Sequence, residues 1–277
     1  LFNHKTEKWN FGLGYDNRFA GRTKKINPDR TNYFIDDEHY IHQNRNDERT
    51  EGLQNLKLNI DFSPNDKNSF SFEALGNLET QDNDETLYTQ VNTNANAFFS
   101  NNRRHSLELE RSKVGELAFT YDRKFDDDRR SLNTCITSSF GKHRENTDID
   151  TYNYDEYQQQ IGDALLQRTH NYENQNISNA IVNYTFPVSE KSIIETGYKG
   201  TFRFFNSDFE SADMINGDYV VNPLASNSFK FNEQINAVYG LMNSSIGDSE
   251  NPKWKYNLGL RAENVSNTAA TQKNSDD

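Results

Sequence analysis

Two stretches of the sequence carry residue types that bind metal ions or ligands in many proteins. In the first, Asp36, Asp37 and Glu38 directly precede His39 and His42, so carboxylates and imidazoles lie at a spacing that suits a metal site. The alternative is a solvated acidic loop, because the six scattered histidines and the single cysteine add no further ligand cluster. We favour the loop, and we expect neither a metal nor a cofactor.

The second stretch interleaves aspartates with tyrosines. Its members are Asp148, Asp150, Tyr152, Tyr154, Asp155 and Tyr157. The carboxylates could bind a cation and the rings could stack on sugars, whereas in the simpler interpretation the tyrosines pack locally within a solvated loop. We favour the solvated loop. If the chain contacts a ligand, the substrate-binding residues that we expect are Tyr152, Tyr154 and Tyr157.

Catalytic chemistry finds no support in the sequence. A transfer or hydrolytic site needs a nucleophile, a base and an orienting group in a recognisable arrangement, and none is evident. The charged run Asp126–Arg130 has the composition of a turn rather than of a site. We expect no catalytic residue and no enzyme activity.

The composition alone gives contradictory signals. Of the 277 residues, 33% are hydrophobic and 26% charged, with a net charge of −12, which would suit a soluble or partly disordered chain. The 19 Phe and 14 Tyr residues argue against disorder, and the acidic balance argues against nucleic acid as a partner. No apolar run approaches the roughly 20 residues of a membrane-spanning helix, but spanning strands leave a much weaker signal. No leader follows Leu1, so we expect any export signal to lie outside these residues.

Alternation in Asn55–Leu78 defines the unit from which the chain is built. Its first arm places apolar side chains on one face of a strand at Leu56, Leu58, Ile60 and Phe62. Ser63–Asn68 is a cluster of turn formers, and the alternation resumes from Phe70 onward. This pattern predicts an antiparallel hairpin with long arms.

The same hairpin recurs three times, with connections at Asp126–Arg130, Pro187–Lys191 and Asn243–Lys253. Leu1–Glu7 is read as a further turn. Between the hairpins lie polar stretches that we interpret as long irregular loops: Ala20–Leu53, Glu79–Ser106, Gly141–Asn174 and Asn206–Ser228.

Strand length separates a membrane barrel from a soluble sheet. The alternation of Trp9–Phe19 spans roughly 36 Å, or about 25 Å of height at a 45° tilt, which is the height of an outer-membrane apolar band. Short turns that alternate with long polar loops are typical of the same barrels. A soluble β-sandwich, the alternative, uses shorter strands. We predict an all-β fold, an antiparallel transmembrane β-barrel with short periplasmic turns and long extracellular loops.

About nine to ten strands are visible, and an open sheet of this kind would leave unpaired edges that lipid does not tolerate. We therefore expect residues 1–277 to form part of a single outer-membrane β-barrel domain, whose plug and remaining strands lie outside this chain. A plugged barrel of the largest common kind has about 22 strands.

The alternation also assigns two faces. The residues predicted to face lipid are Trp9, Phe11, Leu13, Leu58, Ile60, Phe119, Tyr121, Val182, Tyr198, Leu258 and Leu260. The residues predicted to face the lumen are Lys57, Asp61, Glu116, Asp122, Glu195, Lys199 and Arg261. Inward charges such as Arg203 and Glu263 are expected to pair with one another or with a plug. In the last hairpin, alternate residues of Phe229–Leu241, including Tyr239, are set against the face that carries Leu258.

The last hairpin resembles a known family. Phe229–Tyr239, FKFNEQINAVY, followed by Tyr256–Glu263, YNLGLRAE, is similar to the outer-membrane β-barrel family typical of Bacteroidetes, in which F-x-F-x-E-x-I-x-A-x-Y precedes a strand ending G-L-R-x-E. The resemblance implies a location in the bacterial cell outer membrane. It further implies the barrel of a TonB-dependent receptor, which takes up a scarce solute with energy transmitted through TonB.

The same resemblance implies partners: outer-membrane lipid, the TonB system and a surface lipoprotein. The ligand would be a small solute such as a metal chelate, a glycan or a peptide, and the sequence does not choose among them. Because no plug and no TonB box lie within these residues, a second class stays open. It is a non-transporting barrel that serves as a structural or partner-binding component of an outer-membrane protein complex.

Overall fold

The computed structural model describes residues 1–33, 38–93, 97–247 and 252–272. Its regular elements there are all β-strands, and no helix long and apolar enough to cross a membrane occurs in these ranges. The strands are β1 (Phe2–Lys5), β2 (Trp9–Ile26), β3 (Asp29–Tyr33), β4 (Glu38–Asn65), β5 (Asn68–Thr93), β6 (Phe98–Lys124), β7 (Ser131–Tyr154), β8 (Gln160–Ser189), β9 (Ser192–Ile215), β10 (Asp218–Val221), β11 (Asn227–Gly247) and β12 (Pro252–Gln272).

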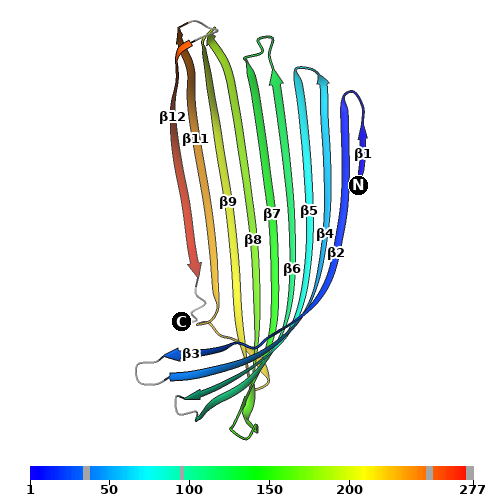
Figure 1. Cartoon of the computed structure of the whole chain (residues 1–277), viewed down its shortest axis with the longest axis vertical. Helices are drawn as coiled ribbons and strands as arrows, with labels where there is room; N and C mark the ends of the chain where they lie inside the picture. The colour runs from blue at the N-terminus through cyan, green and yellow to red at the C-terminus, as the bar shows by residue number, and fades with distance from the viewer. Residues whose placement is uncertain (34–37, 94–96, 248–251, 273–277) are drawn as a thin grey trace.

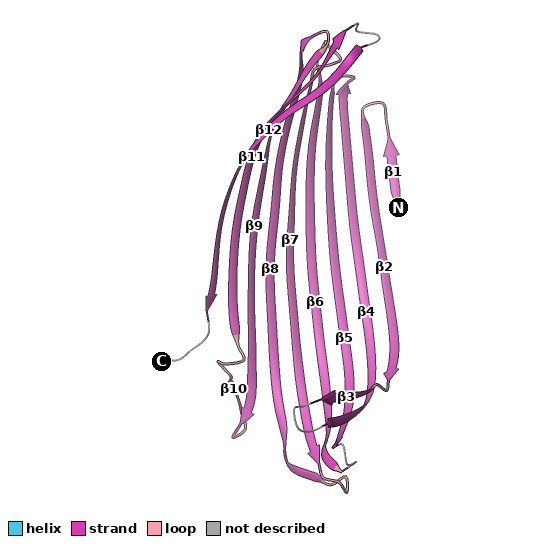
Figure 2. Cartoon of the chain, turned by 60° about the vertical axis from the view of Figure 1, so that its left-hand side comes forward, coloured by secondary structure: helices cyan, strands magenta, loops and turns pink. Residues whose placement is uncertain are grey.

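The strands form one antiparallel sheet, a single curved layer of tall strands (Figures 1 and 2). Ten strands follow the order β1-β2-β4-β5-β6-β7-β8-β9-β11-β12, while β3 pairs with β4 and β10 pairs with β9. Within the described ranges, β1 and β12 are the two edges of the sheet. Open edges do not persist in lipid, so this sheet is a barrel fragment, and its main path of ten strands agrees with the nine to ten expected from the sequence.

The strands are far longer than we predicted from the sequence, and the prediction of four long irregular loops is wrong. β4 has 28 residues and β8 has 30, whereas about 9 to 11 residues suffice to cross a bilayer. Ala20–Leu53, for example, runs through β2, β3 and β4, with cross-strand pairing from Ala20 opposite Glu51 to Ile26 opposite Arg45. A strand with water on both faces needs no apolar alternation, so its sequence looks irregular while its backbone ladder continues.

The short connections are confirmed. Asn65 lies opposite Asn68 at the first turn, and the Asn65 side-chain oxygen accepts hydrogen bonds from the Lys67 backbone N–H (3.1 Å) and the Asn68 amide (2.8 Å). The second turn separates β6 from β7, and the third separates β8 from β9. The predicted connection Asn243–Lys253 is shorter than expected, because β11 extends to Gly247 and β12 begins at Pro252. Leu1–Glu7 is not simply a turn either, since it contains β1.

Cross-strand register sorts the strand residues into two faces. One row of directly opposed residues runs Leu13, Leu58, Ala74 and Leu117, and all the residues predicted to face lipid share this face, which we call the apolar face. The residues predicted to face the lumen all lie on the opposite side, the polar face. The division into two faces is therefore confirmed.

An aromatic row crosses the apolar face near the short turns. Trp9, Phe62, Phe70 and Tyr121 are directly opposed in register, with ring centres 4.1, 6.2 and 4.6 Å apart in that order. Aromatic rows of this kind mark the membrane–water boundary of barrels. On β2, β4, β5 and β6 this face stays apolar toward the other end as far as the row that contains Tyr15, Leu56, Gly76 and Gly115.

The last hairpin departs from the predicted arrangement. Val238, Gly240 and Met242 lie opposite Ala262, Leu260 and Leu258, so Tyr239 and the alternate residues of Phe229–Leu241 are on the polar face. The prediction that they share a face with Leu258 is wrong. Both faces of β11 carry apolar residues, and a shift of one position exchanges the two faces of a strand. Alternation therefore could not fix the face, whereas pairing with β9 does.

A two-layer hydrophobic core is missing from the described part of the sheet, where the buried apolar residues are Ile41, Ala212 and Ala237. Large apolar side chains instead project outward, and Leu258 and Leu260 are 64% and 86% exposed. Such a surface is unstable in water but suits contact with lipid.

Candidate functional site

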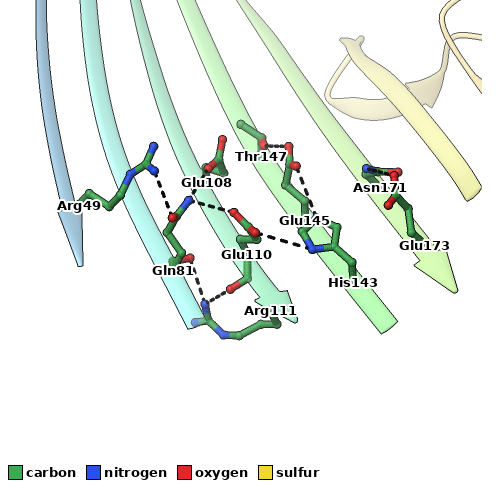
Figure 3. A network of polar contacts seen from close by, with 10 residues as sticks. All are labelled: Arg49, Gln81, Glu108, Glu110, Arg111, His143, Glu145, Thr147, Asn171 and Glu173. Carbon is green, nitrogen blue, oxygen red and sulfur yellow. Dashed lines mark hydrogen bonds and ion pairs between the residues drawn. The ribbon is translucent and has the colours of Figure 1, made fainter. Parts of the chain in front are cut away.

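Beyond the apolar band, the polar face carries a network of charged side chains on β4 to β8 (Figure 3). Gln81, Glu110 and Glu145 are directly opposed in one row, and Arg49 and Glu108 belong to the next row on the same face. The long strands position this network, because the side chains of every second residue in a strand point to the same face of the sheet. We call Glu108, Glu110 and Glu145 the acidic cluster.

Gln81 ties the acidic cluster together. Its side-chain nitrogen donates hydrogen bonds to Glu110 Oε2 (2.9 Å) and Glu108 Oε1 (3.4 Å). Its side-chain oxygen accepts one from Arg49 Nη1 (3.1 Å). From the apolar face, Arg111 Nη1 donates to the backbone oxygens of Gln81 (3.2 Å) and Glu110 (2.7 Å). These contacts fix two neighbouring carboxylates in place.

His143 lies between two carboxylates of the cluster. Its Nδ1 is 3.7 Å from Glu110 Oε1, and its Nε2 is 3.9 Å from Glu145 Oε2. Thr147 donates a hydrogen bond to Glu145 at 3.5 Å. When it is protonated, the imidazolium would therefore partly balance the acidic cluster.

Burial raises the pKa of the Glu108 carboxyl, and the nearby charges of Glu145 and Glu110 raise it further. Arg49 and the hydrogen bond from Gln81 oppose this shift. Glu108 therefore holds its proton more readily than an ordinary glutamate. The cluster can accept hydrogen bonds and balance cations, but no group of metal-ligating side chains is found in the described ranges.

The inward charges predicted to pair do so in part. Arg203 Nη1 is 2.9 Å from Glu233 Oε2, and Arg261 Nη2 is 2.5 Å from Glu263 Oε2. Glu195 accepts a hydrogen bond from Asn243 at 3.3 Å. The polar face thus carries charge inside the apolar band as well as beyond it.

Tyr152, Tyr154 and Tyr157 lie together at the tip of the β7–β8 hairpin. Tyr152 and Tyr154 are on the same face of β7, which is the face of Lys142 and is opposite to the acidic cluster, and Tyr157 is 74% exposed in the turn that follows. The guanidinium of Arg103 lies 4.7 Å from the Tyr152 ring centre. Asp155 caps the turn, since its Oδ1 accepts hydrogen bonds from the backbone N–H groups of Tyr157 and Gln159. Ligand contact at these tyrosines stays a prediction.

Two of the three aspartates beside the tyrosines, Asp148 and Asp155, are already engaged in structure. Asp148 pairs with Arg168 Nε at 2.6 Å, and this contact raises the pKa of the Arg168 guanidinium. In the other candidate stretch, His42 Nδ1 contacts the Asp29 carboxylate, and the His39 ring lies 4.4 Å from the Phe99 ring. Asp36 and Asp37 lie outside the described residues.

The acidic cluster was missed because its residues fall in stretches read as loops. One signal was present: Leu107-Glu108-Leu109-Glu110 alternates with period two, as a strand does. His143 and Glu145 follow the same period on β7. Only the cross-strand register brings the two strands into contact.

Comparison with solved structures finds only weak likeness. The Pseudomonas putida toluene transporter TodX has 7% identity over 97% of this chain and 91% of its own, with a TM-score of 0.22. OccK5 (OpdH) of Pseudomonas aeruginosa has 9% identity over 95% and 99%, with a TM-score of 0.16. The translocator domain of the autotransporter NalP from Neisseria meningitidis has 10% identity over 95% and 88%, with a TM-score of 0.12. Likenesses at this level carry no argument, and no curated protein matches the chain.

The family comparison is informative. The outer membrane protein beta-barrel family matches residues 123–277, which is more than half of the chain and includes the hairpin with Tyr239 and Arg261. The match agrees with the open antiparallel sheet, its two faces and its aromatic row. The chain therefore belongs to the outer membrane protein beta-barrel family and lies in the bacterial outer membrane.

Proposed function

We propose that residues 1–277 form part of the wall of an outer-membrane receptor that takes up a scarce polar solute by a TonB-dependent route. The observation that carries this proposal is the charge on the polar face at the height of the apolar band. Lys57 lies between Leu56 and Leu58 of the apolar face, Glu116 lies next to Leu117, and Arg203, which pairs with Glu233, lies between Phe202 and Phe204. Charged side chains inside a membrane face water or protein rather than lipid, which supports a solvated or plugged lumen.

The breadth of the sheet supports a wide lumen. Its ten-strand path leaves both edges to be paired by further strands. Barrels of about 22 strands are plugged, since an open lumen of that width would leak. The resemblance of Phe229–Glu263 to barrels of Bacteroidetes receptors is the support for the TonB-dependent route and for that source.

The far end of the polar face would meet the solute first. There the acidic cluster offers fixed acceptors on the polar face, while the exposed Tyr157 stands at a hairpin tip and Tyr152 and Tyr154 lie beside it on the opposite face of β7. Tyrosine rings and carboxylates together suit a glycan, a peptide or a metal chelate. Tyr152, Tyr154 and Tyr157 remain our candidate contact residues, and the acidic cluster on the polar face would line the lumen nearer to the membrane.

Binding of TonB tests the proposal directly. The full-length protein that contains this chain would be purified in detergent, and its affinity for the isolated periplasmic domain of TonB measured by calorimetry. A TonB-dependent receptor binds this domain. Absence of binding, together with absence of a plug in the full-length protein, would instead support a structural barrel in an outer-membrane complex.

A further inference from the structure

A groove on the apolar face crosses β4, β5, β6 and β7 near the far edge of the apolar band. Its volume is about 670 Å³, and its lining is mostly apolar. The groove exists because Gly76 and Gly115 are directly opposed, with Leu56 and Phe140 on either side of them in the same row. No atom lies within 4 Å of the position that a Cβ would take on either glycine.

Two lysines stand at the far end of this groove. Lys113 and Lys142 line it and are directly opposed on β6 and β7, one row beyond Gly115 on the same face. Like charges directly opposed across two strands destabilise a sheet. Neither ammonium has a hydrogen bond or ion pair with any described residue. Arg111, the neighbouring residue of β6 on the same face, forms an ion pair with Asp82, with 2.5 Å between its Nη1 and Asp82 Oδ1. Among the described residues, none therefore compensates the two lysine charges.

The height of the lysines matches a lipid headgroup. Lys113 lies on the apolar face of β6, eight residues before Tyr121, which belongs to the aromatic row at the short-turn boundary. That separation is about 27 Å along a strand, or about 19 to 22 Å of height at the 35–45° tilt of such barrels, so the lysine side chains reach the far edge of an apolar band about 25 Å tall. The groove therefore lies at the depth of acyl chains, with its cations at the depth of phosphates in the leaflet remote from the short turns.

We propose that this groove is a binding site for a phosphate-bearing lipid of that leaflet, with an acyl chain over Gly76 and Gly115 and the phosphate between Lys113 and Lys142. Charge complementarity carries the choice of occupant, because an anion removes the repulsion between the two lysines. An acyl chain fills the space that the two missing side chains leave. The site rests on membership of the outer-membrane family and not on the proposed uptake.

Lys230 provides a matched control. It lies on the same face of the sheet, in the same cross-strand row as Lys113 and Lys142, and it is exposed. The residues next to it in the row below are Asn232 and Phe204, with no glycine gap. Lys230 therefore has the same charge on the same face without the groove.

Native mass spectrometry of the full-length protein tests the proposal, with lipid A from the expression host and the same lipid A after removal of its phosphates as probes. The wild-type protein should retain lipid A, and the K113Q/K142Q variant should retain it about tenfold less. Dephosphorylated lipid A should be retained as weakly by the wild type. The K230Q variant should behave as wild type.

The G76L variant, which fills the groove, should also lose retention while both lysines remain; heat-modifiable gel mobility establishes that each variant is folded. Equal retention by wild type and K113Q/K142Q would overturn the proposal, since the lysines would then only reach toward water. An equal loss in K230Q would overturn it too, because the effect would be that of general surface charge.

Discussion

Tyr239 of β11 lies directly opposite Arg261 of β12, with the guanidinium carbon 6.0 Å from the ring centre, on the polar face of the sheet. On its other side the ring covers Gly197 of β9, and its hydroxyl donates a hydrogen bond to the Asn183 side chain of β8. One tyrosine thus joins four strands. Tyr239 and Arg261, which both belong to the family resemblance, therefore point into the barrel and not toward lipid.

The fit of Tyr239 over Gly197 predicts a large effect for a small substitution. A Cβ on Gly197 would lie 2.5 Å from the Tyr239 ring and 2.7 Å from the Val182 backbone oxygen. Gly197→Ala should therefore lower the free energy of unfolding by about 1 to 3 kcal/mol, measured by urea titration in detergent. Gly240→Ala is the control, because open space surrounds that position. Equal stability of the two variants would refute the packing described here.

Adjacent residues on opposite faces of β4 provide a second test. Leu58→Arg places a charge on the apolar face at mid-band and should cost about 2 to 4 kcal/mol of folding free energy. Asn59→Arg places the same charge on the polar face and should be nearly silent. Folding into lipid vesicles measures both. The assignment of faces fails if Asn59→Arg is the more damaging of the two.

The two faces of the sheet could be predicted from the sequence where apolar residues occupy only every second position of a strand. On β4, Leu56, Leu58 and Ile60 alternate with polar residues, and the register confirms the face that alternation assigned. On β11, Val238 and Tyr239 are both suited to an apolar surface, so only pairing with β9 decides. Alternation of apolar and polar residues appears when lipid contacts one face of a strand and water the other. It is absent from a strand with water on both faces, so such a strand cannot be recognised in this way.

The same limit explains the candidate site. Glu108 and Glu110 lie on strands beyond the membrane, where polar residues occupy both faces and the pattern resembles a loop. Their contacts with Gln81 and His143 depend on register between strands distant in sequence. The tyrosines at the tip of the β7–β8 hairpin were recognised by residue type alone, and their role is still a prediction.

Glu108 should make stability depend on pH. Its pKa is raised in the folded state by burial and by Glu145, so folding favours the protonated form. The stabilisation is complete below the unfolded-state pKa and is lost as the pH rises through the higher folded-state pKa. Glu108→Gln should lack this loss, and thermal unfolding should show its advantage over wild type growing with pH in that window. The exposed Glu190→Gln serves as control; parallel pH profiles for wild type and Glu108→Gln would contradict the assignment.

The two ends of the sheet should lie on opposite sides of the membrane. A short epitope inserted after Gln158, in the β7–β8 turn, should bind antibody on intact cells, because long ends of barrels are extracellular. The same epitope inserted after Asp128, in a short turn, should bind only after the outer membrane is permeabilised. Antibody binding to intact cells only in the second case would invert the orientation.

The central claim is that one face of this sheet contacts lipid and the other does not, and Ser138 and Ser139 test it most directly. Ser138 lies on the apolar face, where its hydroxyl bonds Ser178 at 2.9 Å, while Ser139 lies on the polar face opposite Glu116. With Cys135 changed to Ser, a spin label would be attached to Ser138→Cys or Ser139→Cys in the full-length protein, reconstituted in lipid. Electron paramagnetic resonance would then measure collisions with oxygen, which concentrates in lipid, and with a water-soluble nickel chelate. Our account predicts high oxygen accessibility at position 138 and low at 139; equal or reversed accessibilities would contradict it.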